Sequence, residues 1–183
     1  MDKCVGQWDT VVYNVKQVGR SGKLICVAKL ISKIFFKHNM LIGEYTHTID
    51  DKNRLSLPAK FRQEMGKKIV VTPGLDSCLF VFTQKEWLKI EEKLNQSSIG
   101  QADSRSFSRH MFAGATEAEV DSIGRILIPE FLRDRANLKS KVVVIGVSSR
   151  VEIWNEKTWG EYKKVVEKQA DTLAEKLGQV GVL

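Results

Sequence analysis

The stretch DDKNRLSLP at residues 50–58 decides the fold, because a related stretch, DSIGRILIP, follows at residues 121–129. At an offset of 71 positions the residue types correspond at five places: Ile49 with Val120, Asp50 with Asp121, Arg54 with Arg125, Pro58 with Pro129, and Arg62 with Arg133. The similarity extends to Trp87 and Trp159 at an offset of 72. The chain is therefore built from two related halves, and one structural explanation serves both.

Each copy of the motif predicts a strand, a tight turn and a second strand. The predicted strands are residues 44–49, 55–57, 118–120 and 126–128. An Asp at the start of a turn accepts hydrogen bonds from backbone N–H groups two residues further on. We therefore expect Asp50 and Asp121 to organise the two turns. Asn53 and Gly124 occupy the fourth position, where both residue types tolerate a positive φ.

A proline follows each outgoing strand. Pro58 and Pro129 fit the first position of a helix, where the missing N–H group needs no partner. Short helices are therefore expected at residues 59–65, ended by Gly66, and at residues 130–136.

The net charge of +7 at pH 7 is unevenly distributed. Residues 1–39 hold seven lysines and arginines against two aspartates, so +5 lies there and only +2 in residues 40–183. Net charge accounts only for non-specific attraction to nucleic acid. A prediction of DNA binding therefore has to rest on local clusters of basic side chains.

The sequence contains no pattern typical of an enzyme. The cysteines Cys4, Cys26 and Cys78 form no CxxC pair and have no histidine at metal-ligand spacing, which predicts a reduced, cytoplasmic protein. Cys78 lies in an apolar run and is expected to be buried. His47 and His110 belong to no nucleophile–base constellation, and no phosphate-binding loop is present. We expect no catalytic residue, no metal, no cofactor and no small-molecule substrate.

Residues 1–39 have no counterpart in the repeat. We expect an N-terminal extension without a part in the fold, disordered or not native, with Met40 as the functional start. Residues 23–36 are apolar, but lysines interrupt them and they are too short to span a bilayer. A helix lying on a membrane surface is the alternative to the extension that we favour. We expect no membrane partner.

Helical patterns also lie outside the motif. Thr83 and Glu86 predict a capping box before a helix in which Trp87 belongs to the core. A polar joint at residues 95–101 precedes a helix at 103–113. Arg105 and Arg109 share one face of that helix, which we interpret as solvated, with phosphate contact as the alternative.

A long C-terminal helix is expected from Asn155, a capping residue, to Gly178. Its apolar residues recur at spacings of three and four: Trp159, Tyr162, Val166, Ala170, Leu173 and Leu177. This stripe predicts docking on the body of the protein or on a neighbouring subunit. The predicted organisation is an extension (1–39), a first repeat (40–95), a connecting segment with a helix (96–115), and a second repeat with the C-terminal helix (116–183).

From about Met40 to Leu177 the sequence resembles the MraZ family of bacterial transcription regulators, within the AbrB-like swapped-hairpin superfamily. The motifs that carry the resemblance are the two Asp-x-x-x-Arg turns, the Gly43-Glu44-Tyr45 start, and the Leu-Pro or Ile-Pro after each turn. Asn53 departs from the family pattern, which has Gly before the first Arg.

The resemblance implies an α+β, β-rich fold. Two tandem AbrB-like swapped-hairpin repeats would form an intrachain pseudo-dimeric β-barrel with flanking helices. It also implies a ring-shaped homo-oligomer, and a nucleoid-associated regulator that represses its own division and cell-wall operon. Members of the family bind double-stranded DNA at direct repeats upstream of that operon.

The residues themselves support the same mechanism. A hairpin carrying Lys52 and Arg54 is narrow enough to enter a major groove, where Arg bonds two acceptors of guanine. Lys60 and Arg62 either contact phosphates or face solvent. Arg125 is a second candidate reader, although Ile123 replaces the basic residue of the first turn.

Two other interpretations remain. In the first, the Asp and Arg pairs, Asp50 with Arg54 and Asp121 with Arg125, are structural salt bridges without a ligand. In the second, the protein is an antitoxin-like interaction module of the same fold. Co-purification of a tight protein partner in place of DNA would favour that module.

Overall fold

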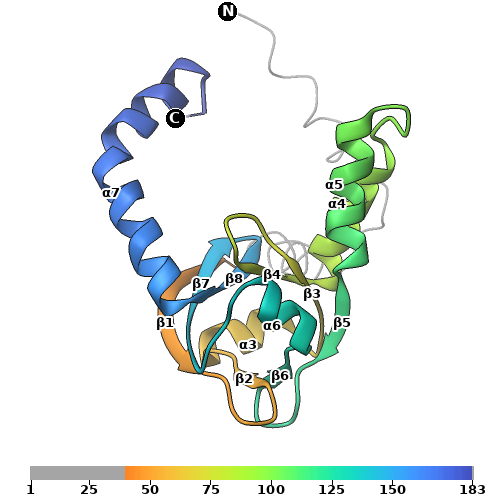
Figure 1. Ribbon diagram of the computed structural model, residues 1–183, viewed down its shortest axis with the longest axis vertical. Coiled ribbons are helices and arrows are strands. Elements are labelled where there is room, and N and C mark those ends of the chain that lie inside the picture. Colours follow the sequence, from red (N-terminus) through yellow and green to blue (C-terminus); the bar gives the residue numbers. More distant parts are fainter. Residues whose placement is uncertain (1–39, 183) are drawn as a thin grey trace, which may run out of the picture. The chain divides into compact units, whose positions relative to one another are not determined.

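Two related series of strands and helices alternate along residues 40–182, the part of the chain that this computed structural model describes (Figure 1). The expectations for residues 1–39 lie outside the described residues. The first half contains β1 (Leu41–Thr48), β2 (Arg54–Ser56), α3 (Ala59–Met65), β3 (Lys68–Pro73), β4 (Leu79–Thr83) and α4 (Gln84–Asn95). Next come α5 (Ala102–Ala113), β5 (Thr116–Glu119), β6 (Arg125–Leu127), α6 (Glu130–Arg135), β7 (Lys141–Ser148), β8 (Arg150–Asn155) and α7 (Glu156–Gln179).

The two halves exchange strands. The main sheet has the order β1-β7-β8-β4-β3-β5, and its neighbouring strands pair in antiparallel fashion. β1 pairs with β7 of the other half, from Leu41 opposite Ser148 to Thr48 opposite Lys141. In the reciprocal exchange, β5 pairs with β3. β2 and β6, one from each half, form a separate two-stranded ribbon.

The α+β, β-rich class and the two repeats are confirmed, but the expected closed barrel is wrong. Within residues 40–182, β1 and β5 remain the two edges of the six-stranded sheet. The reason is local: the chain leaves the main sheet after Ile49 and after Val120 to make the two turns. Ile49 donates its N–H to Ser140 O and Val120 donates to Lys67 O, and the strands beyond the turns pair with each other.

The main core lies between the sheet, the ribbon and the two short helices. Fully buried side chains come from both halves and include Leu55, Leu57, Phe61, Ile69, Leu79, Ile126, Ile128, Leu132, Val144 and Ile153. Strand residues alternate between two faces, so Leu55 and Ile126 point inward while their neighbours in the ribbon point outward. The core thus fixes which side chains the ribbon presents.

The helix starts agree with the sequence with one difference. Thr83 caps α4 by accepting a bond from the Glu86 N–H at 3.2 Å, and Asn155 caps α7 through the Lys157 N–H at 2.9 Å. Pro58 and Pro129, expected as first helical residues, instead occupy the N-cap positions. Their ψ angles of 137° and 146° are extended, so each proline ends the strand segment before its carbonyl accepts the first helical bonds.

Longer helices pack against two different parts of the main sheet (Figure 1). α4 contacts β3 and β4, and α5 contacts β3. The half-buried Trp87 ring lies 6.0 Å from that of Phe82 and 5.7 Å from that of Phe112, measured between ring centroids. α7 contacts β7 and β8 through its first turns, with the Tyr162 ring 5.0 Å from that of Trp154. The predicted helices are present, and Trp87 is a partner in a smaller aromatic contact outside the main core.

Candidate nucleic-acid interface

The β2–β6 ribbon brings the two copies of the motif together on one surface. Its register places Arg54 opposite Leu127 and Ser56 opposite Arg125. Because the residues between them are buried, these four side chains share the outward face. Figure 1 shows the ribbon and its two turns at the end of the sheet away from α4, α5 and α7.

In the first turn, the Asp50 carboxylate is bonded on both oxygens. Oδ1 accepts bonds from the backbone N–H groups of Lys52 and Arg54, at 3.0 and 2.8 Å. Oδ2 accepts from Arg54 Nε at 2.8 Å and lies 2.8 Å from Arg54 Nη2. One carboxylate therefore closes the turn and fixes the direction of the guanidinium.

The second turn repeats this geometry. Asp121 Oδ1 accepts from the N–H groups of Ile123 and Arg125, at 3.1 and 2.8 Å, and Oδ2 accepts from Arg125 Nε at 2.8 Å. Arg125 Nη1 also lies 3.8 Å from Asp50 Oδ2, an ion pair between the halves. The two arginines are 31% and 26% exposed, so each is oriented by the protein yet open to a ligand.

Asn53 adopts the conformation that Gly124 adopts in the other turn. Their φ angles are +60° and +85°, in the left-handed region. Asn is one of the residue types that enter this region at little cost. The Asn53 side chain has a further use, because its Oδ1 accepts a bond from Arg133 Nη1.

Each turn is held by an arginine of the other half. Arg62, on α3, donates to Ile123 O in the second turn at 2.9 Å, to Leu57 O at 2.6 Å and to Ser56 Oγ at 3.0 Å. Its repeat counterpart Arg133, on α6, reaches the first turn at Asn53. Sequence reasoning did not select Arg133, although its offset of 71 from Arg62 was the available signal.

Basic side chains are concentrated on the first half of this surface. Lys52 in the turn and Lys60 at the start of α3 are exposed. The corresponding residues of the second half are Ile123 and Phe131, which are apolar and also exposed. The structure therefore brings Lys52, Arg54 and Arg125 together on the ribbon and its turns. The first half of this surface is basic where the second half is apolar.

Hydrogen bonding lowers the pKa of both turn carboxyls. The pKa of Asp50 lies below its ordinary value of 3.8 because the backbone N–H of Arg54, then its guanidinium, stabilise the charged form. The backbone N–H of Arg125 is likewise the largest influence on the pKa of Asp121, which is also lowered. Both carboxylates are ionised at neutral pH and neutralise part of the arginine charge.

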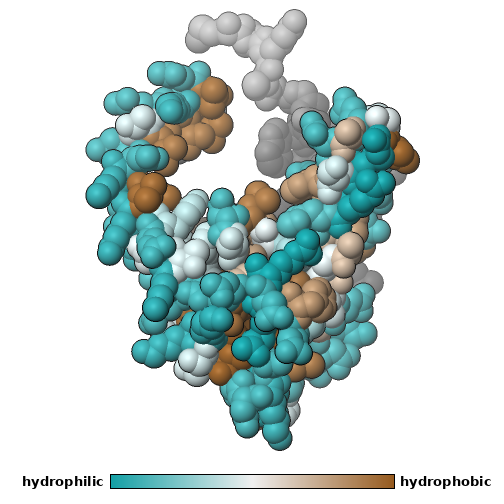
Figure 2. Space-filling model, in the orientation of Figure 1, coloured by the Kyte–Doolittle hydropathy of each residue, from teal (hydrophilic) through white to brown (hydrophobic). Residues whose placement is uncertain are grey.

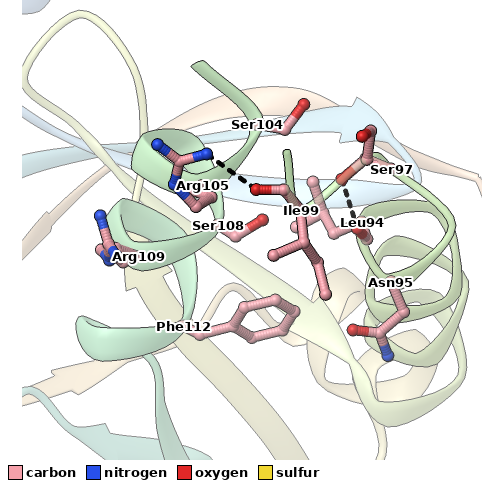
Figure 3. A pocket seen from close by; sticks show the side chains of 10 residues that line it. Leu94, Asn95, Ser97, Ile99, Ser104, Arg105, Ser108, Arg109 and Phe112 are labelled. Atoms are coloured by element: carbon pink, nitrogen blue, oxygen red, sulfur yellow. Dashed lines mark hydrogen bonds between the residues drawn. The ribbon is translucent and has the colours of Figure 1, made fainter. Parts of the chain in front are cut away.

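A cleft of about 350 Å³ between α4 and α5 is a second candidate site (Figure 3). Leu94, Ile99 and Phe112 line it with several serines and two arginines. Arg105 Nη1 donates to the Ile99 and Gly100 carbonyls, both at 2.8 Å, and so closes the connection between the helices. The residues that line the cleft include no nucleophile–base pair.

The remaining candidates from the sequence are the cysteine Cys78, a metal site and a membrane helix. Cys78 is buried and donates to Leu75 O at 3.1 Å, as expected for a structural cysteine, and burial raises the pKa of its thiol. Among residues 40–182, no group of three or more His, Cys, Asp and Glu side chains is placed to hold a metal ion. No helix in the same part of the chain is both long and apolar enough to cross a membrane.

These features define a class: a protein of two intertwined repeats with an Asp–Arg turn in each. A family described as "MraZ protein, putative antitoxin-like" matches residues 40–110 and again residues 111–179. The chain belongs to the MraZ family, which confirms the resemblance found in the sequence.

Relatives in the family cover most of the described residues. The chain is 50% identical over 143 residues to the transcriptional regulator MraZ of Caldanaerobacter subterraneus subsp. tengcongensis, covering 78% of this chain and 100% of the relative. It is 52% identical over 138 residues to the protein of the same name in Moorella thermoacetica, covering 75% and 96%.

We predict that Arg62→Ala destabilises the protein and that Lys60→Ala, on the same helix, does not. Removing Arg62 leaves three acceptors without their partner, which we expect to lower the free energy of unfolding by about 1–3 kcal/mol. Lys60 is exposed, so its replacement should change the free energy by about 0.5 kcal/mol at most. Urea unfolding followed by tryptophan fluorescence measures both. Equal stability of the two variants would contradict the bracing role of Arg62.

A second prediction concerns pH. Because the folded pKa of Asp50 and of Asp121 lies below 3.8, the turn bonds stabilise the folded state fully above that pH. Their contribution is lost as the pH falls through the folded values. Carboxyl-carbon NMR titration should give midpoints below 3.8 for both. Arg54→Ala should raise the midpoint of Asp50 more than that of Asp121, and an unchanged Asp50 midpoint would refute this assignment.

Proposed function

We propose that the protein is a sequence-specific DNA-binding transcription regulator that inserts the β2–β6 ribbon and its turns into the major groove. One observation carries the proposal: two arginines, each fixed by its own aspartate, lie on the outer face of one two-stranded ribbon. A major groove admits a ribbon of this kind. The relatives named transcriptional regulator MraZ support the same conclusion.

The roles of the site residues follow from their contacts. Arg54 uses Nε and one Nη2 hydrogen on Asp50, which leaves three N–H donors for the edge of a guanine. Arg125 is the corresponding reader in the second half. Because the aspartates already orient both guanidiniums, less side-chain freedom is lost on binding. Asp50 and Asp121 position the arginines and do not themselves face the phosphates.

Phosphate contacts belong mainly to the first half. Lys52 and Lys60 are exposed on either side of the ribbon strand β2, where they would fix the register of the protein on the duplex. Arg62 acts chiefly by holding the second turn. A phosphate could bond only to the Arg62 N–H groups that do not already donate to Leu57, Ile123 and Ser56. We propose no cofactor and no catalysis.

The resemblance to the MraZ family supports three further parts of the proposal: the fold superfamily, the location in the cell and the DNA site. We infer an AbrB-like swapped-hairpin fold, since β1 and β5 each pair with the opposite half. The protein would act in the cytoplasm on the nucleoid, binding direct repeats upstream of its own division and cell-wall operon and repressing it. The antitoxin-like module is the second candidate, favoured by the wording of the family description and by exposed apolar residues such as Phe131.

We further propose that copies of the chain assemble into a ring. The second half of α7 exposes the expected stripe through Leu173 and Leu177, and Figure 2 shows hydrophobic residues along this helix. The α4–α5 pair exposes Leu88, Ile99 and Phe107. The α7 surface and the α4–α5 surface lie on helices that pack against different strands of the main sheet. Contact between α7 of one copy and α4–α5 of the next is therefore head-to-tail, and a head-to-tail contact repeated around an axis closes into a ring. Several ribbons in one ring would bind repeated sites with a raised effective concentration.

DNA binding is tested with the full chain and a duplex carrying the region upstream of its own gene, over a salt series. We expect Arg54→Ala to weaken binding about 5- to 150-fold, the equivalent of one bidentate guanine contact. Arg109→Ala is the control, because Arg109 lies on α5 away from the ribbon. The proposal is rejected if wild type binds the upstream and a scrambled duplex equally. A tightly co-purifying protein partner would then favour the antitoxin-like module.

Assembly has its own test. Leu173→Glu places a charge in the apolar stripe of α7 and is expected to lower the mass of the particle in analytical ultracentrifugation. Lys164→Glu alters an exposed residue off the stripe of the same helix and should leave the mass unchanged. A monomeric wild type, or a Leu173→Glu variant of wild-type mass, would contradict the ring.

A further inference from the structure

Three positions on the ribbon, its turns and the short helices beside it differ in the same way between the two halves. Lys52 corresponds to Ile123, Ser56 to Leu127, and Lys60 to Phe131, each pair 71 positions apart. The three residues of the second half are 58%, 56% and 50% exposed. In each case a polar or basic side chain of the first half is replaced by an exposed apolar one.

Leu127 has a defined place among the proposed reading residues. It lies directly opposite Arg54 across the ribbon and two residues from Arg125 on the same strand face. Its neighbour Ile126 is fully buried, so the strand alternation directs Leu127 outward. An exposed hydrocarbon side chain therefore lies beside two arginines whose guanidiniums are held by aspartates.

The two arginines beside Leu127 restrict which kind of molecule can bind over it. An apolar protein surface placed on Leu127 would also remove Arg54 and Arg125 from water without giving their remaining N–H groups a partner, which is costly. The major groove can present hydrogen-bond acceptors for the arginines and an apolar group for Leu127 on adjacent base pairs. Guanine supplies two acceptors for an arginine, and the C5 methyl of thymine supplies an apolar contact.

We propose that Leu127 contacts the C5 methyl group of a thymine and is a specificity-determining residue of the second half. The inference rests on the proposed DNA binding and goes beyond it in one respect: the two strands of the ribbon read different bases. At the related position of the first half, Ser56 Oγ accepts a bond from Arg62 Nη2 at 3.0 Å. Ser56 has no apolar side chain to offer a methyl group. The ribbon therefore has a defined orientation on its DNA site.

Replacing thymine by deoxyuridine tests this contact, because it removes only the C5 methyl group. The full chain is titrated with duplexes of the upstream region in which one thymine at a time is replaced. Wild type should lose about fourfold in affinity at one thymine within each bound site, as expected for one buried methyl group. Leu127→Ser, which installs the residue found at position 56, should bind the thymine and uracil duplexes equally well. Leu127→Ala repeats the test with a second side chain.

Leu75→Ser is the matched control, because Leu75 is 51% exposed, close to the 56% of Leu127, but lies between β3 and β4, outside the ribbon and its turns. It should keep the fourfold difference between thymine and uracil. The proposal is overturned if no single thymine methyl affects wild type, if both Leu127 variants keep the difference, or if Leu75→Ser abolishes it. Failure of DNA recognition itself is detected separately, since wild type would then show no preference for the unmodified upstream duplex over a scrambled one.

Discussion

The exchange of strands between the two halves is the constraint on which the rest of the structure depends. Neither half can complete the main sheet alone, because β1 finds its partner in β7 and β5 finds its partner in β3. A strand without a partner leaves its backbone N–H and C=O groups unsatisfied. The exchange leaves β2 and β6 to pair with each other, and this pairing creates the one surface that carries residues of both motifs.

Cross-bracing turns that surface into a rigid one. Arg62 and Arg133 connect the helix of one half to the turn of the other, and the Leu57 N–H and Gly124 O join the same segments at 2.9 Å. The side chains at the turns are therefore set by contacts on both sides of the pseudo-symmetric fold. This second layer of hydrogen bonds restricts the turns and the arginines beside them to one geometry.

The sequence alone was enough to predict the repeat, the two turns, the caps Thr83 and Asn155, and the positions of Asp50 and Arg54, because these depend on neighbours within a few residues. The sequence did not predict which strands pair, because an alternating pattern shows which face of a strand is buried but not which strand is its neighbour in the sheet. The closed barrel came from the resemblance and was wrong, as β1 and β5 are sheet edges. The repeat paired Arg133 with Arg62, but the contact that Arg133 makes was missed because its partner Asn53 is 80 residues away.

Pairing between β1 and β7 has a consequence for synthesis on the ribosome. Leu41 lies opposite Ser148, more than 100 residues later, so β1 leaves the ribosome well before its partner strand exists. At about 5–20 residues per second, the wait is roughly 5–20 s. During that time the nascent first half must keep Leu41, Ile49 and Leu55 out of contact with other chains. Translation pauses or chaperone binding before β7 emerges would therefore influence how much of this protein reaches its native state.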